Sequence, residues 1–155
     1  MAKSNSDFVP CMLIPLQQRY LILPNSLIAE VLPVPLVSNT DRSDHFLIGQ
    51  YQWQQSTIPF LDMETLIDKR PSAYQDANKI CILYSITDNA LNAYAIPCYG
   101  ALQLIHLSQD VINITETPTP MTDYIHCEIY IGNKVASIPN LDSIETMLIS
   151  QTITP

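Results

Sequence analysis

The chain has 155 residues, 47% of them hydrophobic, and a mean hydropathy of +0.11. This composition suits one domain with a proper core, or two fused subdomains, and excludes disorder over most of the length. Asp and Glu outnumber Lys and Arg by 15 to 7, which gives a net charge of −8 without any basic run. Such a surface repels nucleic acid and anionic membranes, so we expect neither as a partner.

Charged residues make up only 14% of the chain, below the roughly 25% usual in soluble domains. This favours either a surface partly covered by a partner or one rich in neutral polar residues. No apolar run approaches the roughly 18 residues that cross a bilayer, and the start, MAKSNSDFVP, lacks the pattern of a secretory signal. We expect a soluble, cytoplasmic protein without direct membrane insertion.

Short apolar runs follow one another in the first half of the chain. Residues 11–16 and 19–23 are predicted strands on either side of a Gln-Gln turn. Residues 25–32 (NSLIAEVL) have apolar side chains at helical spacing behind an Asn25 cap, which predicts a short helix ended by Pro33.

Two more β-rich runs, HFLIGQYQW and STIPFL, flank a tight turn at Gln54 and Gln55. Asp62 is then the predicted N-cap of a short helix, METLI. Residues 69–78 (KRPSAYQDAN) are polar and broken by a proline, which predicts an internal linker.

The second half continues the strand pattern. KICILYSI and LNAYAIPCY predict a hairpin around residues 88–90, and ALQLIHL, VINI, YIHCEIYI and KVASI predict further strands, with residues 132–133 as a turn. A helix over about 142–149 closes the fold, and QTITP is a frayed tail. Many short strands of this spacing predict small barrels or a sandwich rather than a parallel α/β sheet.

Two segments of the first half recur in the same order in the second half. Residues 58–67 (IPFLDMETLI) match residues 138–148 (IPNLDSIETML), and residues 20–32 (YLILPNSLIAEVL) match residues 94–105 (YAIPCYGALQLI). Coincidence between common strand–turn–helix patterns explains one match better than two in order. We infer a duplication and expect two similar half-domains packed side by side, each too small to bury a core well alone.

The order of these motifs resembles the CheW-like domain family over about residues 10–149. The family segment xxVxEV corresponds to residues 28–31 (IAEV), and its G-x-x-x-L-R-G-x-x-x-P-x-x-D-L stretch is similar to residues 49–62, with Gly49, Pro59 and Asp62 in register. Its V-D-x-V-x-x-V segment resembles residues 98–104. The closing L-D-x-x-x-L-L resembles the stretch that begins at residue 141.

This sequence departs from the family pattern at the turn, where Gln54-Gln55 replaces Arg-Gly, and at Tyr99, which replaces an acidic residue. Several signature glycines are also absent. The segment PNSLIAEVLP and Trp53 before the turn are similar to the ChpC and PilI type, accessory adaptors of pilus-linked chemosensory systems.

The resemblance implies an all-β fold with short helices, in which two SH3-like five-stranded β-barrel subdomains pack side by side. Residues 1–9 are then a flexible N-terminus, residues 10–149 a single CheW-like domain whose halves divide near 69–78, and residues 150–155 a C-terminal tail.

The implied function is that of a non-enzymatic adaptor, or scaffold, in bacterial chemotaxis signal transduction that controls type IV pilus twitching motility. One barrel binds the regulatory domain of a histidine kinase, and the groove between the barrels receives the cytoplasmic tip of a chemoreceptor. The alternative is a structural or ligand-binding β-barrel protein that has lost kinase coupling, which the missing arginine at Gln54 favours.

The resemblance assigns partner contact to a set of positions in both halves, although simpler roles stay open for several of them. Ile28 can belong to the core, Glu30 can be a solvated charge, and Gly49 can occupy a strand bulge. Gly100 can serve a position that needs a positive φ. The predicted partner-binding residues are Ile28, Glu30, Gly49, Gln54, Tyr99, Gly100 and Leu102.

Neither a metal site nor catalysis finds support in the residues. His45, His106 and His126 show no convergence of the three or four ligands that zinc requires, and the four scattered cysteines read as small buried hydrophobes. No Gly-rich phosphate loop or nucleophile motif occurs, so a small hydrolase would need a convergence in space that sequence does not display. Asp62 and Asp142 suit helix caps better than an aspartic dyad. We expect no cofactor.

Overall fold

Ten strands and two α-helices make up the part of the chain that the computed structural model describes, residues 8–34, 46–69, 76–87, 91–108, 124–131 and 134–153. The first half holds β1 (Phe8–Pro15), β2 (Tyr20–Pro24), the 3-10 helix η2 (Asn25–Leu27), β3 (Ile28–Pro33), β4 (Leu47–Trp53), β5 (Ser56–Leu61) and α1 (Met63–Asp68). The second half holds β6 (Lys79–Tyr84), β7 (Ala93–Cys98), β8 (Gln103–Ser108), β9 (Ile125–Ile131), β10 (Lys134–Pro139) and α3 (Leu141–Ile153).

Several predicted segments lie outside these described residues. They are the strand VINI, the turns at 88–90 and 132–133, most of the linker 69–78, and His45.

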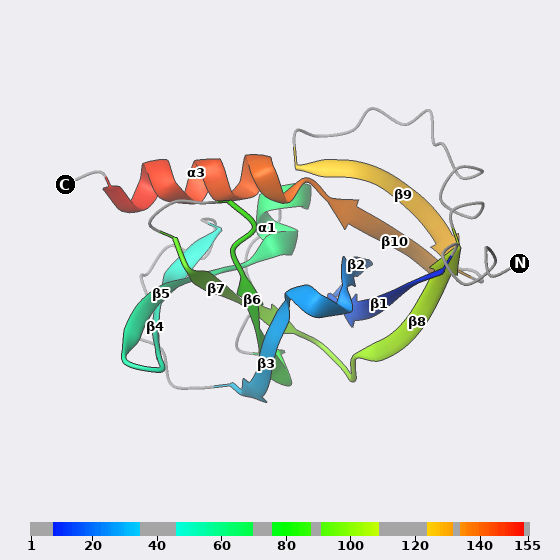
Figure 1. Cartoon of the computed structure of the whole chain (residues 1–155), viewed down its shortest axis with the longest axis horizontal. Coiled ribbons are helices and arrows are strands. Elements are labelled where there is room, and N and C mark those ends of the chain that lie inside the picture. Colours follow the sequence, from blue (N-terminus) through cyan, green and yellow to red (C-terminus); the bar gives the residue numbers. More distant parts are fainter. Residues whose placement is uncertain are drawn as a thin grey trace, which may run out of the picture.

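The strands form two five-stranded sheets, sheet A in the order β8-β1-β2-β10-β9 and sheet B in the order β3-β6-β7-β5-β4. They lie side by side, with α3 running along one edge of the molecule and α1 between them (Figure 1). Each sheet curls into an SH3-like barrel, so the predicted fold class is confirmed.

The topology contains the repeat that the sequence matches indicated. Replacing every strand of sheet A by the strand five places away along the chain gives the order of sheet B. However, β1 and β2 enter sheet A while β3, β4 and β5 enter sheet B, and the second repeat divides in the opposite sense. The two halves of the sequence therefore exchange strands, instead of each building one barrel as separate half-domains would.

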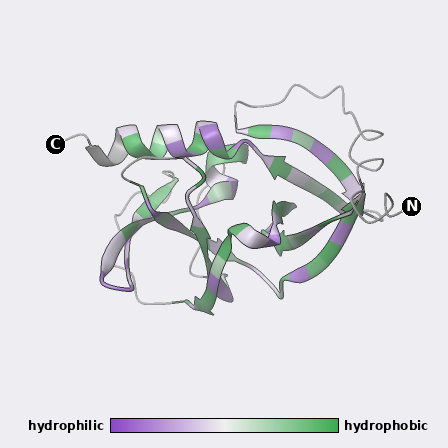
Figure 2. Ribbon diagram, viewed as in Figure 1, coloured by the Kyte–Doolittle hydropathy of each residue, from purple (hydrophilic) through white to green (hydrophobic). Residues whose placement is uncertain are grey.

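Three apolar clusters result from this exchange. One fills sheet A with residues such as Leu13 and Ile129, and another fills sheet B around Phe60. The largest lies between the barrels, where both sheets and both helices contribute, for example Leu21 from β2 and Tyr94 from β7. Hydrophobic and hydrophilic residues alternate along β9, as expected for a strand with one buried face (Figure 2). Because the largest of the three clusters joins the barrels, we expect them to fold as one unit.

The helix predicted over residues 25–32 is wrong. Only Asn25–Leu27 form a single 3-10 turn, which has no side-chain cap, and the chain continues as β3. β3 pairs with β6, with Val31 opposite Cys81. A strand that completes a sheet gains hydrogen bonds and buried area that a short isolated helix lacks, so pairing overrides the helical spacing.

Both predicted helices after strands are present. Asp62 caps α1 as predicted, because its Oδ1 accepts hydrogen bonds from the backbone N–H of Glu64 at 3.0 Å and of Thr65 at 3.1 Å. The second helix, α3, begins at Leu141 and extends to Ile153, beyond the predicted end at 149.

The cap of α3 is Asn140, not the predicted Asp142. The Asn140 side-chain oxygen accepts from the N–H of Ser143 at 3.3 Å, and Asp142 lies in the first turn of the helix. The sequence match therefore found the correct elements but displaced their register by two residues, because leucine and aspartate recur just beyond the true cap.

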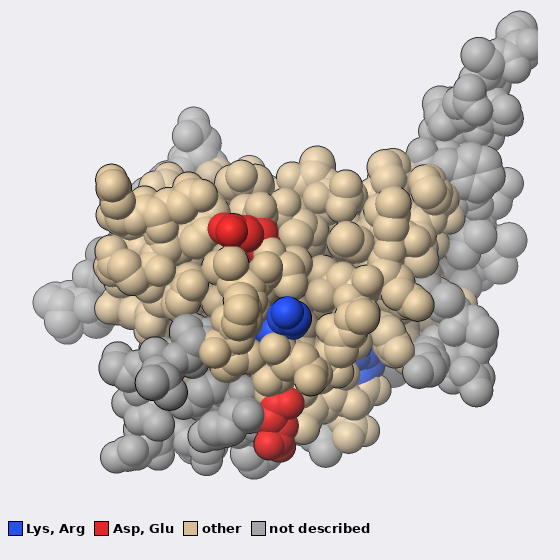
Figure 3. All heavy atoms as spheres, turned by 90° about the horizontal axis from the view of Figure 1, so that it is seen from below, with Lys and Arg blue, Asp and Glu red and all other residues tan. Residues whose placement is uncertain are grey.

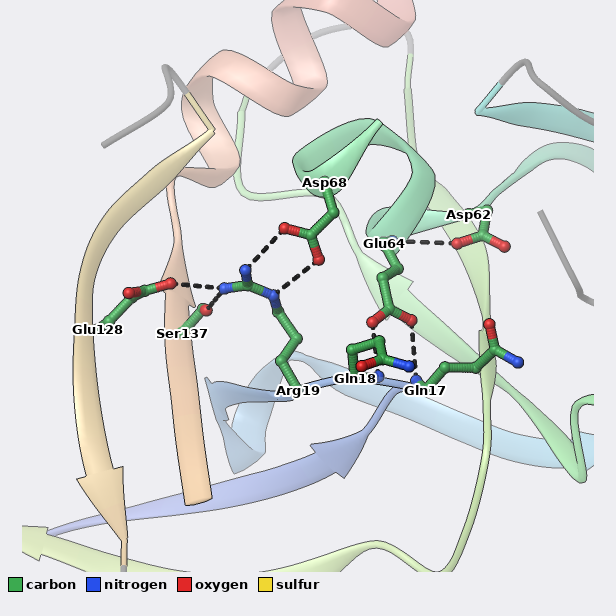
Figure 4. A network of polar contacts seen from close by, with 8 residues as sticks. All are labelled: Gln17, Gln18, Arg19, Asp62, Glu64, Asp68, Glu128 and Ser137. Atoms are coloured by element: carbon green, nitrogen blue, oxygen red, sulfur yellow. Dashed lines mark hydrogen bonds and ion pairs between the residues drawn. The ribbon is translucent and has the colours of Figure 1, made fainter. Parts of the chain in front are cut away.

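A buried carboxylate on α1 binds the hairpin turn of the opposite barrel. α1 follows β5 of sheet B, yet the two oxygens of Glu64 accept from the backbone N–H of Gln17, at 2.8 Å, and of Gln18, at 2.6 Å, in the β1–β2 turn of sheet A (Figure 4). Burial raises the pKa of Glu64, and the nearby charges of Asp68 and Asp62 add to this, while the two hydrogen bonds oppose it.

Glu145 on α3 makes the reciprocal contact. α3 follows β10 of sheet A, and the fully buried Glu145 carboxylate accepts from the β6–β7 connection of sheet B. Its donors are the N–H of Ile86 (2.9 Å) and Thr87 (3.1 Å), the hydroxyls of Ser85 (2.7 Å) and Thr87 (2.8 Å), and the Tyr94 hydroxyl (3.1 Å). Burial, and then the Glu145 charge, raise the pKa of Tyr94.

Arg19 strengthens the contact made by Glu64. It follows Gln18 in the same turn and binds Asp68, the last residue of α1, through Nη2 at 2.7 Å and Nε at 3.1 Å (Figure 4). Its Nη1 donates to Glu128 of β9 at 2.6 Å and to Ser137 of β10 at 2.5 Å. One guanidinium therefore holds α1 against two strands of sheet A.

We predict that Glu145→Ala destabilises the protein by about 3 kcal/mol, because it leaves the buried Tyr94 hydroxyl and the donors of Ser85, Ile86 and Thr87 without their shared acceptor. Glu64→Ala should cost less, about 1–2 kcal/mol, because Gln17 and Gln18 are exposed and water can replace the carboxylate at their N–H groups. Urea denaturation monitored by circular dichroism measures both. Equal losses in the two variants would show that the Glu145 donors are rehydrated as easily as those of Glu64.

Candidate partner-binding groove

A groove of about 470 Å³ opens where β3, the start of β6 and the connection from β7 to β8 meet. This connection is the place where the chain passes from sheet B to sheet A (Figure 1). Figure 3 looks from below onto this face of the molecule, where neutral residues predominate over a few isolated charges. The lining residues are Val31, Asn78, Lys79, Gly100, Ala101 and Leu102.

Sheet B supplies one wall of the groove. Val31 lies opposite Cys81 in the pairing of β3 with β6, and Pro33 lies opposite Lys79. Val31 and Lys79 are therefore diagonal neighbours on the same face of the sheet. Val31 is 39% exposed, and only a few other large apolar side chains of the described residues are exposed to this extent.

The opposite wall is the segment after β7, which is pressed against the end of β1. The Tyr99 N–H donates to the carbonyl of Pro15 at 2.9 Å. A Cβ on Gly100 would lie 3.1 Å from Cγ of the buried Pro15, so close approach accounts for the glycine, whose φ is outside the left-handed region. Leu102 is half-buried and packs against the cluster between the barrels. Both walls of the groove are thus anchored in the core that joins the barrels.

A side-chain hydrogen bond links the two edge strands of sheet B. The indole N–H of Trp53, at the end of β4, donates to Oε1 of Glu30, on β3, at 2.9 Å. Tyr84 packs its ring edge-on against Trp53, with centroids 6.4 Å apart. These contacts close one mouth of the barrel beside the β4–β5 turn.

Comparison with known proteins gives a family for this arrangement. Residues 10–146 match the model of the CheW-like domain. The chain belongs to the CheW-like domain family. Its fold is similar to that of the scaffolding protein TtCheW from Thermoanaerobacter tengcongensis, with a TM-score of 0.62 and 16% identity over 86% of this chain and 89% of that one. Among curated proteins, none matches this sequence.

Only Gly100 and Leu102, of the seven predicted contact residues, line the groove of this CheW-like domain. Ile28 is half-buried against the cluster between the barrels, and Glu30 is exposed but bound to Trp53. Tyr99 is half-buried. Burial first, and then the charges of Asp62 and Glu64, raise its pKa.

Gly49 and Gln54 lie on the β4–β5 hairpin, away from the groove lining. The pairing of β4 with β5 shifts register between Leu47 and Gly49, which agrees with a strand bulge at the glycine. Gln54 is exposed in the turn.

The sequence did not indicate Val31, Asn78, Lys79 or Ala101 as groove residues. Of these four, Val31 could best have been predicted from the sequence, because it belongs to the same family segment as Ile28 and Glu30. Lys79 was hidden at the boundary between a predicted linker and a strand, and only the pairing of β6 with β3 places it beside Val31.

Metal binding finds no support in the parts of the chain that the structure describes, where no three His, Cys, Asp or Glu residues lie together suitably. Neither helix of the described residues has the length and apolar character needed to span a bilayer. A second hollow, of about 720 Å³, runs along the first turns of α3, but none of the seven predicted residues lies there.

The turn where CheW-like domains carry Arg-Gly is strained in this chain. Gln54 has a φ of 47° and Gln55 a φ of 68°, the two positive values of a type I′ hairpin turn. Glycine adopts such angles freely, whereas a residue with a Cβ does so at a cost of about 1 kcal/mol or more.

We predict that Gln55→Gly stabilises the protein by about 1 kcal/mol, which raises the melting temperature by about 2–4 °C for a domain of this size. Gln55→Ala is the matched control, since it removes the side-chain amide but keeps the Cβ, and it should leave the melting temperature unchanged. Scanning calorimetry measures all three proteins. A melting temperature no higher for the glycine variant than for the alanine variant would show that the turn is unstrained.

Proposed function

We propose that this chain is a non-enzymatic, cytoplasmic adaptor that couples chemoreceptors to a histidine kinase. The observation that carries the proposal is the groove between the barrels of a CheW-like domain. The described residues of its lining are three apolar side chains, a glycine, an amide and one lysine, and they include no acid, base and nucleophile that converge as a hydrolase needs.

The groove suits the helical tip of a receptor. A helix that docks in a groove buries one apolar face and needs a receiving surface with few charges. Val31 and Leu102 offer apolar contact from opposite walls. Gly100 adds no side chain to its wall, so a helix can approach the backbone there. The low charged fraction of the chain, 14%, is consistent with surfaces that partners cover.

The kinase contact is proposed for the β4–β5 hairpin of sheet B. Gly49 and Gln54 lie on this hairpin, and Trp53 fixes it to Glu30 across the barrel mouth. A barrel end that is already held rigid loses little conformational entropy when it binds the regulatory domain of a kinase.

The finer proposal is an accessory adaptor in a chemosensory pathway that governs type IV pilus twitching motility. It is supported by the likeness of residues 24–33 and Trp53 to the ChpC and PilI type. Deletion of the gene should reduce twitching while flagellar swimming stays normal, and a swimming defect alone would contradict this assignment.

We predict that Val31→Gln weakens binding of the receptor tip about tenfold, because an incoming apolar helix would have to desolvate the new amide. Val9→Gln is the matched control, since Val9 is also a strand valine with 39% exposure but lies outside the groove. Isothermal titration calorimetry with the cytoplasmic hairpin of a receptor from the same genome measures both. An equal loss of affinity in the Val31 and Val9 variants would show that the groove is not the binding site.

We also predict that Gln54→Arg strengthens binding to the kinase regulatory domain about threefold or more, since it restores the cation usual in the family. Gln52→Arg, at an exposed position of the same hairpin, controls for the added charge. Surface plasmon resonance gives the affinities. If the unmodified chain does not bind the kinase domain and Gln54→Arg changes nothing, the chain is instead a barrel protein that has lost kinase coupling.

A further inference from the structure

We propose that the groove selects a helical partner that presents a carboxylate to Lys79. This inference rests on the proposed function and specifies the chemistry of the partner. Among the described residues that line the groove, Lys79 is the one that carries a charge.

Lys79 stands out because positive charge is scarce in this chain. The sequence has 7 Lys and Arg against 15 Asp and Glu. Within the described residues, Arg19 is held by Asp68 and Glu128 and is only 16% exposed. Lys79 is exposed and forms no ion pair with any part of the chain that the structure describes.

The pairing of the strands determines where the Lys79 ammonium group can reach. Lys79 is the first residue of β6, opposite Pro33 on one side and the buried Cys98 on the other. Its side chain leaves the same face of sheet B as Val31, so the charge stands at the rim of an apolar floor. A long lysine stem can lie along this floor while its head stays in water.

A helix laid in the groove must either pair with this ammonium group or cover it. Covering an unpaired charge removes its hydration without compensation, whereas a facing carboxylate compensates for that loss. The same site therefore favours an acidic helix and penalises a neutral or basic one, which is how a buried or half-buried charge produces specificity.

The net charge of the whole protein opposes this local preference for an acidic helix. With a net charge of −8, the molecule as a whole repels acidic segments. An acidic helix that binds nevertheless has to be oriented so that its carboxylate meets the one cation of the groove. The suitable partner has apolar residues at helical spacing along one face and Asp or Glu beside that face.

Charge reversal tests this inference. The full-length chain and its Lys79→Glu variant are titrated with the receptor hairpin used for Val31→Gln, and we expect affinity to fall about fivefold on the reversal. Lys69→Glu is the matched control, because Lys69 is also exposed and changes the net charge equally but lies outside the groove. It should bind within twofold of the unmodified chain, and thermal unfolding should be unchanged in both variants.

The partner is then varied. Each Asp or Glu near the hairpin tip is changed to Lys, one at a time, and one of these hairpins should restore the affinity of Lys79→Glu while it binds the unmodified chain more weakly. Equal binding by Lys79→Glu and Lys69→Glu, or the lack of any hairpin that rescues, overturns the charge selection and leaves the adaptor function standing. Failure of the unmodified chain to bind any receptor hairpin overturns both.

Discussion

The architecture depends on two buried carboxylates that each join a helix to the opposite barrel. Glu64, on the helix after sheet B, holds the hairpin turn of sheet A, and Glu145, on the helix after sheet A, holds the connection in sheet B. A buried carboxylate without donors is costly, so each helix can dock only where the backbone N–H groups of the other barrel await it. These two contacts specify how the barrels are placed relative to one another.

That placement determines the groove. One wall belongs to sheet B and the other is the segment that carries the chain toward sheet A, so the width of the groove is set by how the two barrels pack. The core between the barrels contains the largest apolar cluster, and Leu102 belongs to both the groove and the packing against that cluster. A docking surface built on a shared core is preorganised, because neither wall can shift without loss of buried apolar area.

In the function proposed here, charge selects what the groove accepts. The acidic excess disfavours contact with nucleic acid and anionic surfaces, while the described lining residues of the groove are neutral except for Lys79. Trp53 and Glu30 hold the other end of sheet B, where the β4–β5 turn is exposed. Groove and turn are thus two separate surfaces on one rigid body, which is what an adaptor between two partners requires.

The sequence alone determined what short stretches of chain encode: the strands, the Asp62 cap, the repeat, the low charged fraction and the family. It assigned residues 25–32 to a helix and the second cap to Asp142, because spacing and cap chemistry were satisfied locally there. Only the tertiary structure decided that β3 pairs with β6 and that the repeats exchange strands. It also placed Val31 and Lys79 on the same face of sheet B, where they form one wall of the groove. Strand pairing joins residues about 50 positions apart, and its free energy comes from buried area and hydrogen bonds that no local pattern contains.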